Sequence, residues 1–194
     1  MTAQPEIVLV RHAETEWSRT GRHTGRTDVP LTDAGREAAV VLGPRLASRR
    51  FALVLCSPLS RARETCALAG FEAAAEYRDD LLEMDYGRYE GLTTAQIREQ
   101  RPDWRLWRDG CPGGEVPADV GVRVDRVIEE CKAASGDVLI FSHGHVLRVL
   151  AARWLRLAAG AGALLMFDAA GISVLGHEHE WRALHKWNLA AGQA

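Results

Sequence analysis

Residues 7–15 read IVLVRHAET, four apolar residues that run directly into an arginine–histidine pair and a polar turn. Three of the four apolar residues are β-branched, and an uninterrupted run of this kind predicts a short strand buried on both faces. Arg11 and His12 follow this strand at its carboxyl end. Because open α/β sheets bind ligands at the carboxyl ends of their strands, the stretch predicts a functional sheet edge.

Two later stretches repeat the pattern of an apolar run followed by polar side chains. Residues 51–56 precede Ser57 and Arg61, and residues 138–141 precede Ser142-His143. Helical patterns alternate with these strands, which predicts an α/β fold, a three-layer α/β/α sandwich with a mainly parallel central sheet. Since parallel strands end at the same edge, we expect the three polar clusters to meet there.

Start and stop signals outline several helices. Thr32 precedes a helical pattern in which Pro44 should kink or end the helix. Ser57 followed by Pro58 predicts an N-cap and the first position of the next helix. Thr93 with Gln96 has capping-box spacing, so a third helix should start there.

The chain contains no repeat, low-complexity tract or linker. We therefore expect residues 1–194 to form a single domain, with a cap-like excursion around residues 80–118. Residues 73–77 predict a short edge strand, and residues 172–175 and 181–184 predict a terminal hairpin.

Composition narrows the class of protein. Apolar residues make up 47%, charged residues 26% and the net charge is −2, which describes an ordinary globular protein with no nucleic-acid or membrane partner. No apolar run approaches the roughly 20 residues of a membrane span, and the first residues lack the basic start of a signal peptide. We expect a cytoplasmic protein. Its four cysteines lack metal-site spacing and should be free thiols: Cys56, Cys66, Cys111 and Cys131.

Two arginines and two histidines would converge at the predicted edge, namely Arg11, His12, Arg61 and His143. An arginine guanidinium offers a planar fork to two phosphate oxygens, and helix N-termini add backbone N–H donors. The cluster therefore predicts a site for a dianionic group such as a phosphoryl group. Residues 177–179, His-Glu-His, lack a further ligand and predict a solvated hairpin turn rather than a metal site.

These motifs resemble those of a known family. Residues 11–15, RHAET, are similar to the Arg-His-Gly-Glu-Thr signature of the histidine phosphatase superfamily, in its phosphoglycerate mutase-like branch. The resemblance continues in family order to about residue 150, through residues 57–62, Glu83 and residues 142–144. It implies a phosphoglycerate mutase-like fold. Further motifs resemble a subgroup with small acid phosphatases and sedoheptulose bisphosphatase, among them residues 21–25, 107–111, 143–145 and 168–172.

The resemblance also implies a role for each matched residue. His12 matches the nucleophile that becomes phosphohistidine. Arg11, Arg61 and a positively charged His143 match the pocket that holds the phosphoryl group. Glu83 matches the acid that protonates the leaving oxygen and then serves as base toward water. This chemistry implies no metal and no cofactor.

Five further residues fall where the family contacts its substrate or where the subgroup would line the pocket: Ser18, His23, Thr24, Gly25 and His145. For His145, a plain start of the helix after Gly144 explains the sequence as well. Asp85 is an alternative to Glu83 as the catalytic acid.

The implied activity is metal-independent hydrolysis of phosphomonoesters, with a small phosphorylated metabolite such as a sugar phosphate or bisphosphate as substrate. Met84 stands where mutases carry an arginine for the substrate carboxylate, which favours hydrolysis. Two alternatives stay open. One is phosphoglycerate mutase-type phosphoryl transfer. The other is a non-catalytic phosphate-binding partner protein, which the complete set of nucleophile, arginines, second histidine and acid disfavours.

Overall fold

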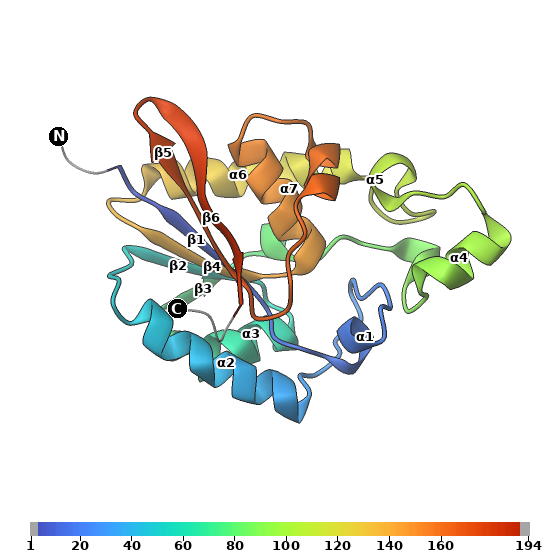
Figure 1. The fold of residues 1–194 in the computed structure, drawn as a ribbon, viewed down its shortest axis with the longest axis horizontal. Coiled ribbons are helices and arrows are strands. Elements are labelled where there is room, and N and C mark those ends of the chain that lie inside the picture. The colour runs from blue at the N-terminus through green and yellow to red at the C-terminus, as the bar shows by residue number, and fades with distance from the viewer. Residues whose placement is uncertain (1–3, 191–194) are drawn as a thin grey trace.

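Six strands form one central sheet in the computed structural model, which describes residues 4–190 (Figure 1). The strand order across the sheet is β3-β2-β4-β1-β5-β6. The first four strands of this order run parallel to one another, β5 pairs antiparallel with β1, and β6 antiparallel with β5. The strands are β1 (Ile7–Arg11), β2 (Leu53–Cys56), β3 (Ala75–Tyr77), β4 (Val138–Ser142), β5 (Ile172–Glu178) and β6 (Trp181–Leu189).

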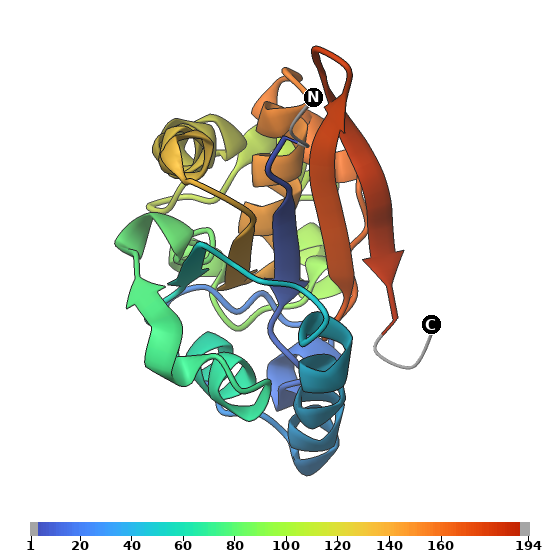
Figure 2. The same cartoon turned by 90° about the vertical axis from the view of Figure 1, so that its left-hand side faces the viewer.

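Helices cover both faces of this sheet. In Figure 2, α6 and α7 lie on one side of the strands, and α2 and α3 lie on the other. The predicted three-layer α/β/α sandwich is therefore confirmed. The α-helices are α1 (Glu16–Arg19), α2 (Asp33–Leu46), α3 (Ser60–Leu68), α4 (Thr94–Gln100), α5 (Leu106–Asp109), α6 (Pro117–Ala133) and α7 (Gly144–Trp154), and four short 3-10 helices are η1 (Glu72–Ala74), η2 (Asp79–Leu81), η3 (Gly87–Tyr89) and η4 (Ala159–Leu164).

The alternation of side chains along the central strands divides the core in two. In β1, Ile7 and Leu9 pack in the cluster that contains the apolar face of α6 and α7, whereas Val8 and Val10 pack in the cluster that contains α2 and α3. Residues 138–141 of β4 alternate in the same way. Successive side chains of a strand point to opposite faces, so an uninterrupted apolar run is what a sheet covered on both faces requires.

Two local predictions differ at least in part from the structure. Helix α2 does not end at Pro44 but continues through it to Leu46, so of the predicted kink or end the end is wrong. Pro44 lies in the last turn and has no N–H to donate to the Val40 carbonyl. Both residues are exposed, so water can donate to that carbonyl instead. Ser57 is not the N-cap of α3, because Leu59 holds that position. The helix starts later than predicted, and the Ser57 hydroxyl is left for the sheet edge.

Other local predictions are confirmed. Thr93 forms the capping box of α4 with Gln96, and Thr32 caps α2. The edge strand β3 and the terminal hairpin β5–β6 are present, the hairpin strands being longer than predicted. None of the helices within residues 4–190 is long and apolar enough to cross a membrane.

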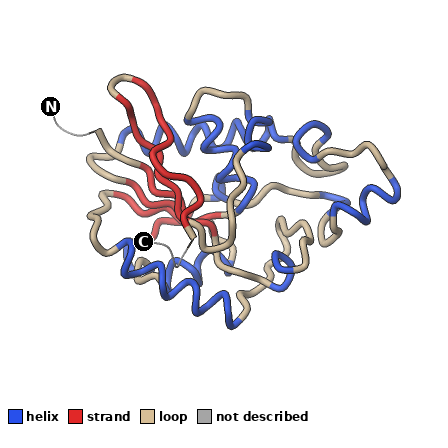
Figure 3. Tube along the Cα trace, in the orientation of Figure 1, coloured by secondary structure: helices blue, strands red, loops and turns tan. Residues whose placement is uncertain are grey.

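The segment around residues 80–118 extends away from the sheet as an excursion that is mostly loop, with the short helices α4 and α5 (Figure 3). Its buried residues Ile97, Trp104 and Leu106 belong to the same apolar cluster as the inner face of α6 and α7. The excursion is therefore packed onto the helical layer beside the carboxyl ends of the strands.

Candidate active site

The polar clusters at three strand ends meet at one edge of the sheet. Strands β1 and β4 pair in register so that Arg11 lies beside Ser142. The backbone N–H of His12 donates to the Ser142 carbonyl at 2.8 Å, and that of Ser57 donates to the Phe141 carbonyl at 2.9 Å. The hydrogen bonds between β2, β4 and β1 thus continue one residue beyond the strands and fix the backbone positions of His12 and Ser57.

A cavity of about 200 Å³ opens at this edge, and we call it the catalytic cavity. Seven of the predicted site residues line it: Arg11, His12, Ser18, His23, Thr24, Glu83 and His145. Three predicted residues, Arg61, His143 and Gly25, are buried next to it, and the ring of His143 lies 5.1 Å from that of His12. The fold therefore brings all ten to one place.

His12 is buried and held in one tautomer. Its Nδ1 lies 2.8 Å from the Ala13 carbonyl, which can only accept, so Nδ1 carries the proton and Nε2 keeps a free lone pair. Burial lowers the pKa of His12 well below its ordinary value, and the positive charges of Arg61 and Arg11 lower it further. The ring is neutral, which is the state in which an imidazole nitrogen attacks phosphorus.

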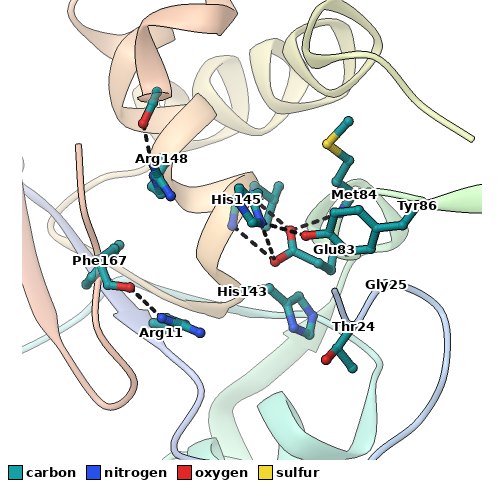
Figure 4. Close-up of polar contacts among 12 residues, drawn as sticks. Arg11, Thr24, Gly25, Glu83, Met84, Tyr86, His143, His145, Arg148 and Phe167 are labelled. Carbon is teal, nitrogen blue, oxygen red and sulfur yellow. Dashed lines mark hydrogen bonds and ion pairs between the residues drawn. The ribbon is translucent and has the colours of Figure 1, made fainter. Parts of the chain in front are cut away.

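Arg11 offers an unused donor next to His12. Its Nη1 donates to the Phe167 carbonyl, as Figure 4 shows, while its buried Nε has no hydrogen-bond partner among the described residues. A Cβ at position 144 would lie 3.2 Å from this Nε, so Gly144 allows the close approach of the guanidinium to the start of α7. A buried N–H without an acceptor is costly, and an anion in the cavity would satisfy it.

Arg61 uses its donors on the protein itself. Its Nη1 and Nη2 donate to the carbonyls of Thr27, Thr24 and Gly25, and its Nε donates to Nδ1 of His143 at 3.2 Å. Arg61 is fully buried. Arg61 holds the loop of residues 24–27 and the ring of His143 at the sheet edge, and its role toward a phosphoryl group, which the resemblance implies, stays a prediction.

His143 is neutral, in contrast to the positive charge expected from the sequence. Because its Nδ1 accepts from Arg61, the proton lies on Nε2, which donates to the Ser57 hydroxyl at 2.7 Å. Burial lowers the pKa of His143 well below its ordinary value, and Arg61 lowers it further. The partner of this histidine is thus Ser57, which sequence reasoning assigned to a helix cap.

Glu83 is a buried loop residue whose side chain lies against the N-terminus of α7. Its carboxylate accepts hydrogen bonds from three backbone N–H groups (Figure 4). Met84 and Val146 donate to Oε1 at 2.9 and 3.0 Å, and His145 donates to Oε2 at 3.0 Å. Asp85, the alternative acid, accepts from the backbone of Gly87 and does not line the catalytic cavity. The geometry favours Glu83 for any proton transfer in the cavity.

His23 and His145 also line the catalytic cavity, His145 from the start of α7 just after β4. The Tyr86 hydroxyl and Nδ1 of His145 are 2.6 Å apart, and Nε2 of His23 is 3.2 Å from the Thr94 hydroxyl. Burial lowers the pKa of His23 to about 4 and that of His145 well below its ordinary value. Both rings are neutral hydrogen-bonding groups. His145 both starts α7 and lines the cavity, so the two interpretations of the sequence hold together.

The hydroxyls of the two remaining predicted contacts are already hydrogen-bonded. Ser18 accepts from the Thr15 N–H and donates to the Thr15 carbonyl, within the capping box of α1. The Thr24 hydroxyl donates to the Arg22 carbonyl. Both side chains line the cavity, but a ligand would have to displace these bonds to receive a hydroxyl proton.

Sequence reasoning missed several residues of the lining, and Arg148 is the most informative. It lies one turn after His145 on α7, is buried, and donates to the carbonyls of Gly162 and Ala163 in η4. Its guanidinium also stacks on the Trp107 ring at 4.5 Å. The spacing of three residues from His145 on a helix is the signal that predicts a shared face. The other missed lining residues are Gly21, Arg22, Tyr86, Gly144, Met166, Phe167 and Asp168.

Across residues 4–190, no group of three histidine, cysteine, aspartate or glutamate side chains is placed to hold a metal ion. His177 and Glu178 end β5, and His179 lies in the turn of the hairpin. The ionisable groups that line the catalytic cavity are imidazoles, guanidinium groups, the Tyr86 hydroxyl and the carboxylates of Glu83 and Asp168.

Comparisons with known proteins agree with this arrangement. An acid phosphatase of Mycobacterium tuberculosis is 43% identical over 197 residues, covering 96% of this chain and 97% of the relative. A sedoheptulose 1,7-bisphosphatase of Saccharomyces cerevisiae is 35% identical over 185 residues, covering 79% and 68%. The solved structure of a mycobacterial glucosyl-3-phosphoglycerate phosphatase superposes with a TM-score of 0.86 at 29% identity, covering 95% of this chain and 98% of that one. The family model of the histidine phosphatase superfamily (branch 1) matches residues 7–190, and the chain belongs to that family.

Proposed function

We propose that this chain is a metal-independent phosphatase of small phosphorylated metabolites that works through a phosphohistidine on His12. The observation that carries the mechanism is the state of His12. Its ring is neutral, its Nδ1–H is fixed on the Ala13 carbonyl, and it lines the same cavity as Arg11 and Glu83. Family membership and the phosphatase names of the relatives support the class of reaction.

In the first half of the reaction, Nε2 of His12 attacks phosphorus. The P–N bond forms as the P–O bond to the leaving group breaks, and the leaving oxygen takes a proton from the Glu83 carboxyl group. Arg11, whose Nε has no acceptor among the described residues, neutralises charge on the phosphoryl oxygens.

In the second half, water attacks the phosphohistidine while Glu83 accepts its proton. The P–N bond breaks, inorganic phosphate leaves, and the neutral imidazole is restored. The carboxylate is held by three backbone N–H groups, so it keeps its position through both halves.

Hydrolysis rather than mutase transfer is supported by Met84. Its side chain is buried in the apolar cluster under α6 and α7, so this position offers no cation to a substrate carboxylate. Incubation with 3-phosphoglycerate should release inorganic phosphate. Accumulation of 2-phosphoglycerate without phosphate release would show a mutase instead.

The test of the mechanism is His12→Ala assayed with p-nitrophenyl phosphate in the presence of a chelator. We expect at least about a 10³-fold loss of kcat with an unchanged circular dichroism spectrum, because nucleophilic catalysis has no substitute. His179→Ala, at the exposed hairpin turn, is the matched control and should keep wild-type activity. Activity retained by His12→Ala would overturn the mechanism, and so would the absence of an acid-labile phosphoryl group in a rapid-quench experiment on the wild type.

A further inference from the structure

A second and larger cavity, of about 760 Å³, adjoins the catalytic cavity, and we call it the distal cavity. The two cavities share His23 and His145 as lining residues. Most of the remaining lining comes from the excursion, from the end of α4 to α5. A substrate whose phosphoryl group lies at His12 would therefore extend past the two histidines into the distal cavity.

The distal cavity is lined by cations at its rim and by two tryptophans deeper in. Its arginines are Arg98, Arg105 and Arg108, and its one lining acid is Asp103. Trp104 is buried and Trp107 half-buried, so their rings form the less polar part of the lining.

The three arginines differ in how far the protein already satisfies them. Arg108 is paired with Asp109 through two hydrogen bonds, of 2.8 and 2.9 Å. Arg98 uses its Nε on the Trp104 carbonyl and has no ion pair within residues 4–190. The guanidinium of Arg105 makes neither a hydrogen bond nor an ion pair with any described residue. Against the single lining acid Asp103, Arg98 and Arg105 thus give the cavity a net positive charge.

The boundary between the two cavities carries no charge. Burial lowers the pKa of His23 to about 4, and Tyr86 and Thr94 engage the rings of His145 and His23. Along the path of a substrate the protein therefore offers a cation at Arg11, then neutral hydrogen-bonding groups, then cations at Arg98 and Arg105. Complementary charge in a ligand would be negative at both ends and neutral but polar between them.

We infer that the distal cavity binds a second anionic group, a phosphate or a carboxylate, at the far end of a hydroxyl-rich substrate. The inference rests on the proposed function and names its substrate class, phosphorylated sugars or polyols that carry an acidic group at each end. Arg98 and Arg105 receive the distal anion, and His23 and His145 face the hydroxyl-bearing middle.

The kinetic test compares substrates that differ only in the distal group. Fructose 1,6-bisphosphate and 6-phosphogluconate carry two acidic groups, whereas fructose 6-phosphate and fructose 1-phosphate carry one. We expect kcat/KM about tenfold or more higher for at least one of the two diacids, because charge-assisted hydrogen bonds to an arginine are worth this much. The preferred diacid tells phosphate from carboxylate as the distal group. Equal kcat/KM for diacids and monophosphates would overturn the inference.

Variants of the excursion then assign the preference to these arginines. Arg105→Gln should lower the ratio of diacid to monophosphate kcat/KM about tenfold, mainly through KM, and adding Arg98→Gln should lower it further. Arg101→Gln is the matched control, because Arg101 is exposed in the same excursion but does not line the cavity. An Arg105→Gln ratio equal to that of the wild type, or to that of Arg101→Gln, would contradict the assignment.

A binding measurement separates this inference from the proposed function. Calorimetry on His12→Ala should give a Kd for fructose 1,6-bisphosphate or 6-phosphogluconate about tenfold below that for fructose 6-phosphate, and Arg105→Gln in that background should remove the difference. Equal Kd values, or no binding of any of the three, would overturn the distal site. His12-independent hydrolysis of p-nitrophenyl phosphate would overturn the mechanism alone.

Discussion

The catalytic cavity and the distal cavity lie side by side but are built from different kinds of structure. The catalytic cavity stands on strand ends whose register is set by the ladder of β1, β4 and β2. The distal cavity is lined by loop residues and short helices, and its arginines are exposed at the rim. Hydrogen bonds hold His12, Arg11 and Glu83 of the first cavity, while the guanidinium of Arg105 in the second makes none with the described residues.

This difference separates the two tasks of the enzyme. Phosphoryl transfer needs a nucleophile, an acid and a cation at fixed positions, and a sheet edge supplies such positions. Choice of substrate needs groups that can vary without disturbing that edge, and loops supply those. Four measurements test whether the two cavities divide the work in this way.

The largest effect is expected for Glu83→Gln, which removes the proposed proton donor of the catalytic cavity. With glycerol 3-phosphate, whose leaving group needs a proton, kcat should fall by about 10²–10⁴-fold. The fall should be smaller with p-nitrophenyl phosphate, whose leaving group departs as an anion. Asp85→Asn is the control and should change both rates by no more than a few-fold. A larger loss in Asp85→Asn than in Glu83→Gln would assign the acid role to Asp85.

Arg61→Met tests how much the buried hydrogen bonds of Arg61 beside the catalytic cavity stabilise the fold. The change leaves three loop carbonyls and Nδ1 of His143 without their donor in a buried place. The free energy of unfolding, from urea titration, should fall by about 3 kcal/mol or more. Arg63→Met, two residues along the same helix, removes only an exposed stack on Tyr77 and should cost about 1 kcal/mol or less. Similar losses in the two variants would show that the buried network does not hold the edge.

Arg148→Met tests the connection between the two cavities, because Arg148 lines the first and stacks on a tryptophan of the second. Loss of its bonds to η4 should lower the free energy of unfolding by about 1–3 kcal/mol. KM for a sugar bisphosphate should rise more than kcat falls, since the substrate path is disturbed more than the nucleophile. Arg153→Met on the same helix breaks a partly exposed pair with Asp125 and an exposed hydrogen bond to the Leu157 carbonyl, and its cost should be about 1 kcal/mol or less. Equal unfolding free energies and equal KM values in Arg148→Met and Arg153→Met would show that Arg148 does not position the substrate.

The smallest effect concerns pH and His23, at the boundary. Its pKa in the fold is about 4, below that of a histidine in the unfolded chain, so between these values only the unfolded state takes up the proton. Stability should therefore fall as the pH drops from about 6.5 to 4, and His23 contributes up to about 1.4 kcal/mol per pH unit to that slope. His23→Asn should flatten the dependence of Tm on pH. His179→Asn is the control, and an unaltered slope in His23→Asn would show that the boundary ring is not held neutral.

Much of the site follows from local pattern. The run IVLV followed by Arg11 and His12 predicts both a strand and what stands at its end, and the same holds for residues 138–143. Their convergence follows from the rule that parallel strands share an edge. Arg11 and His12 line the catalytic cavity for this reason, whereas Ser18, His23, Thr24 and Glu83 were indicated by the family resemblance.

What local pattern cannot supply is the partner of each polar group. The sequence suggests a helix cap for Ser57 and a charged imidazole for His143, but the fold places them in contact, 86 positions apart in the chain. Arg61 contacts carbonyls 34 to 37 residues away instead of lining the cavity. Such choices depend on which buried donors and acceptors meet once the layers have packed.

Periodicity and strand-end chemistry thus specify, without any structure, an α/β sheet whose edge carries Arg11 and His12, because both signals are local in the chain. Glu83 follows no strand, and only the family resemblance indicated it. The protonation of His143, the supporting role of Arg61 and the place of Arg148 emerge only when the chain folds. The distal cavity also emerges only on folding, since its lining residues are spread along the chain from His23 to Ala163. Burial and long-range hydrogen bonds decide these features, and neither can be read from neighbours in the sequence.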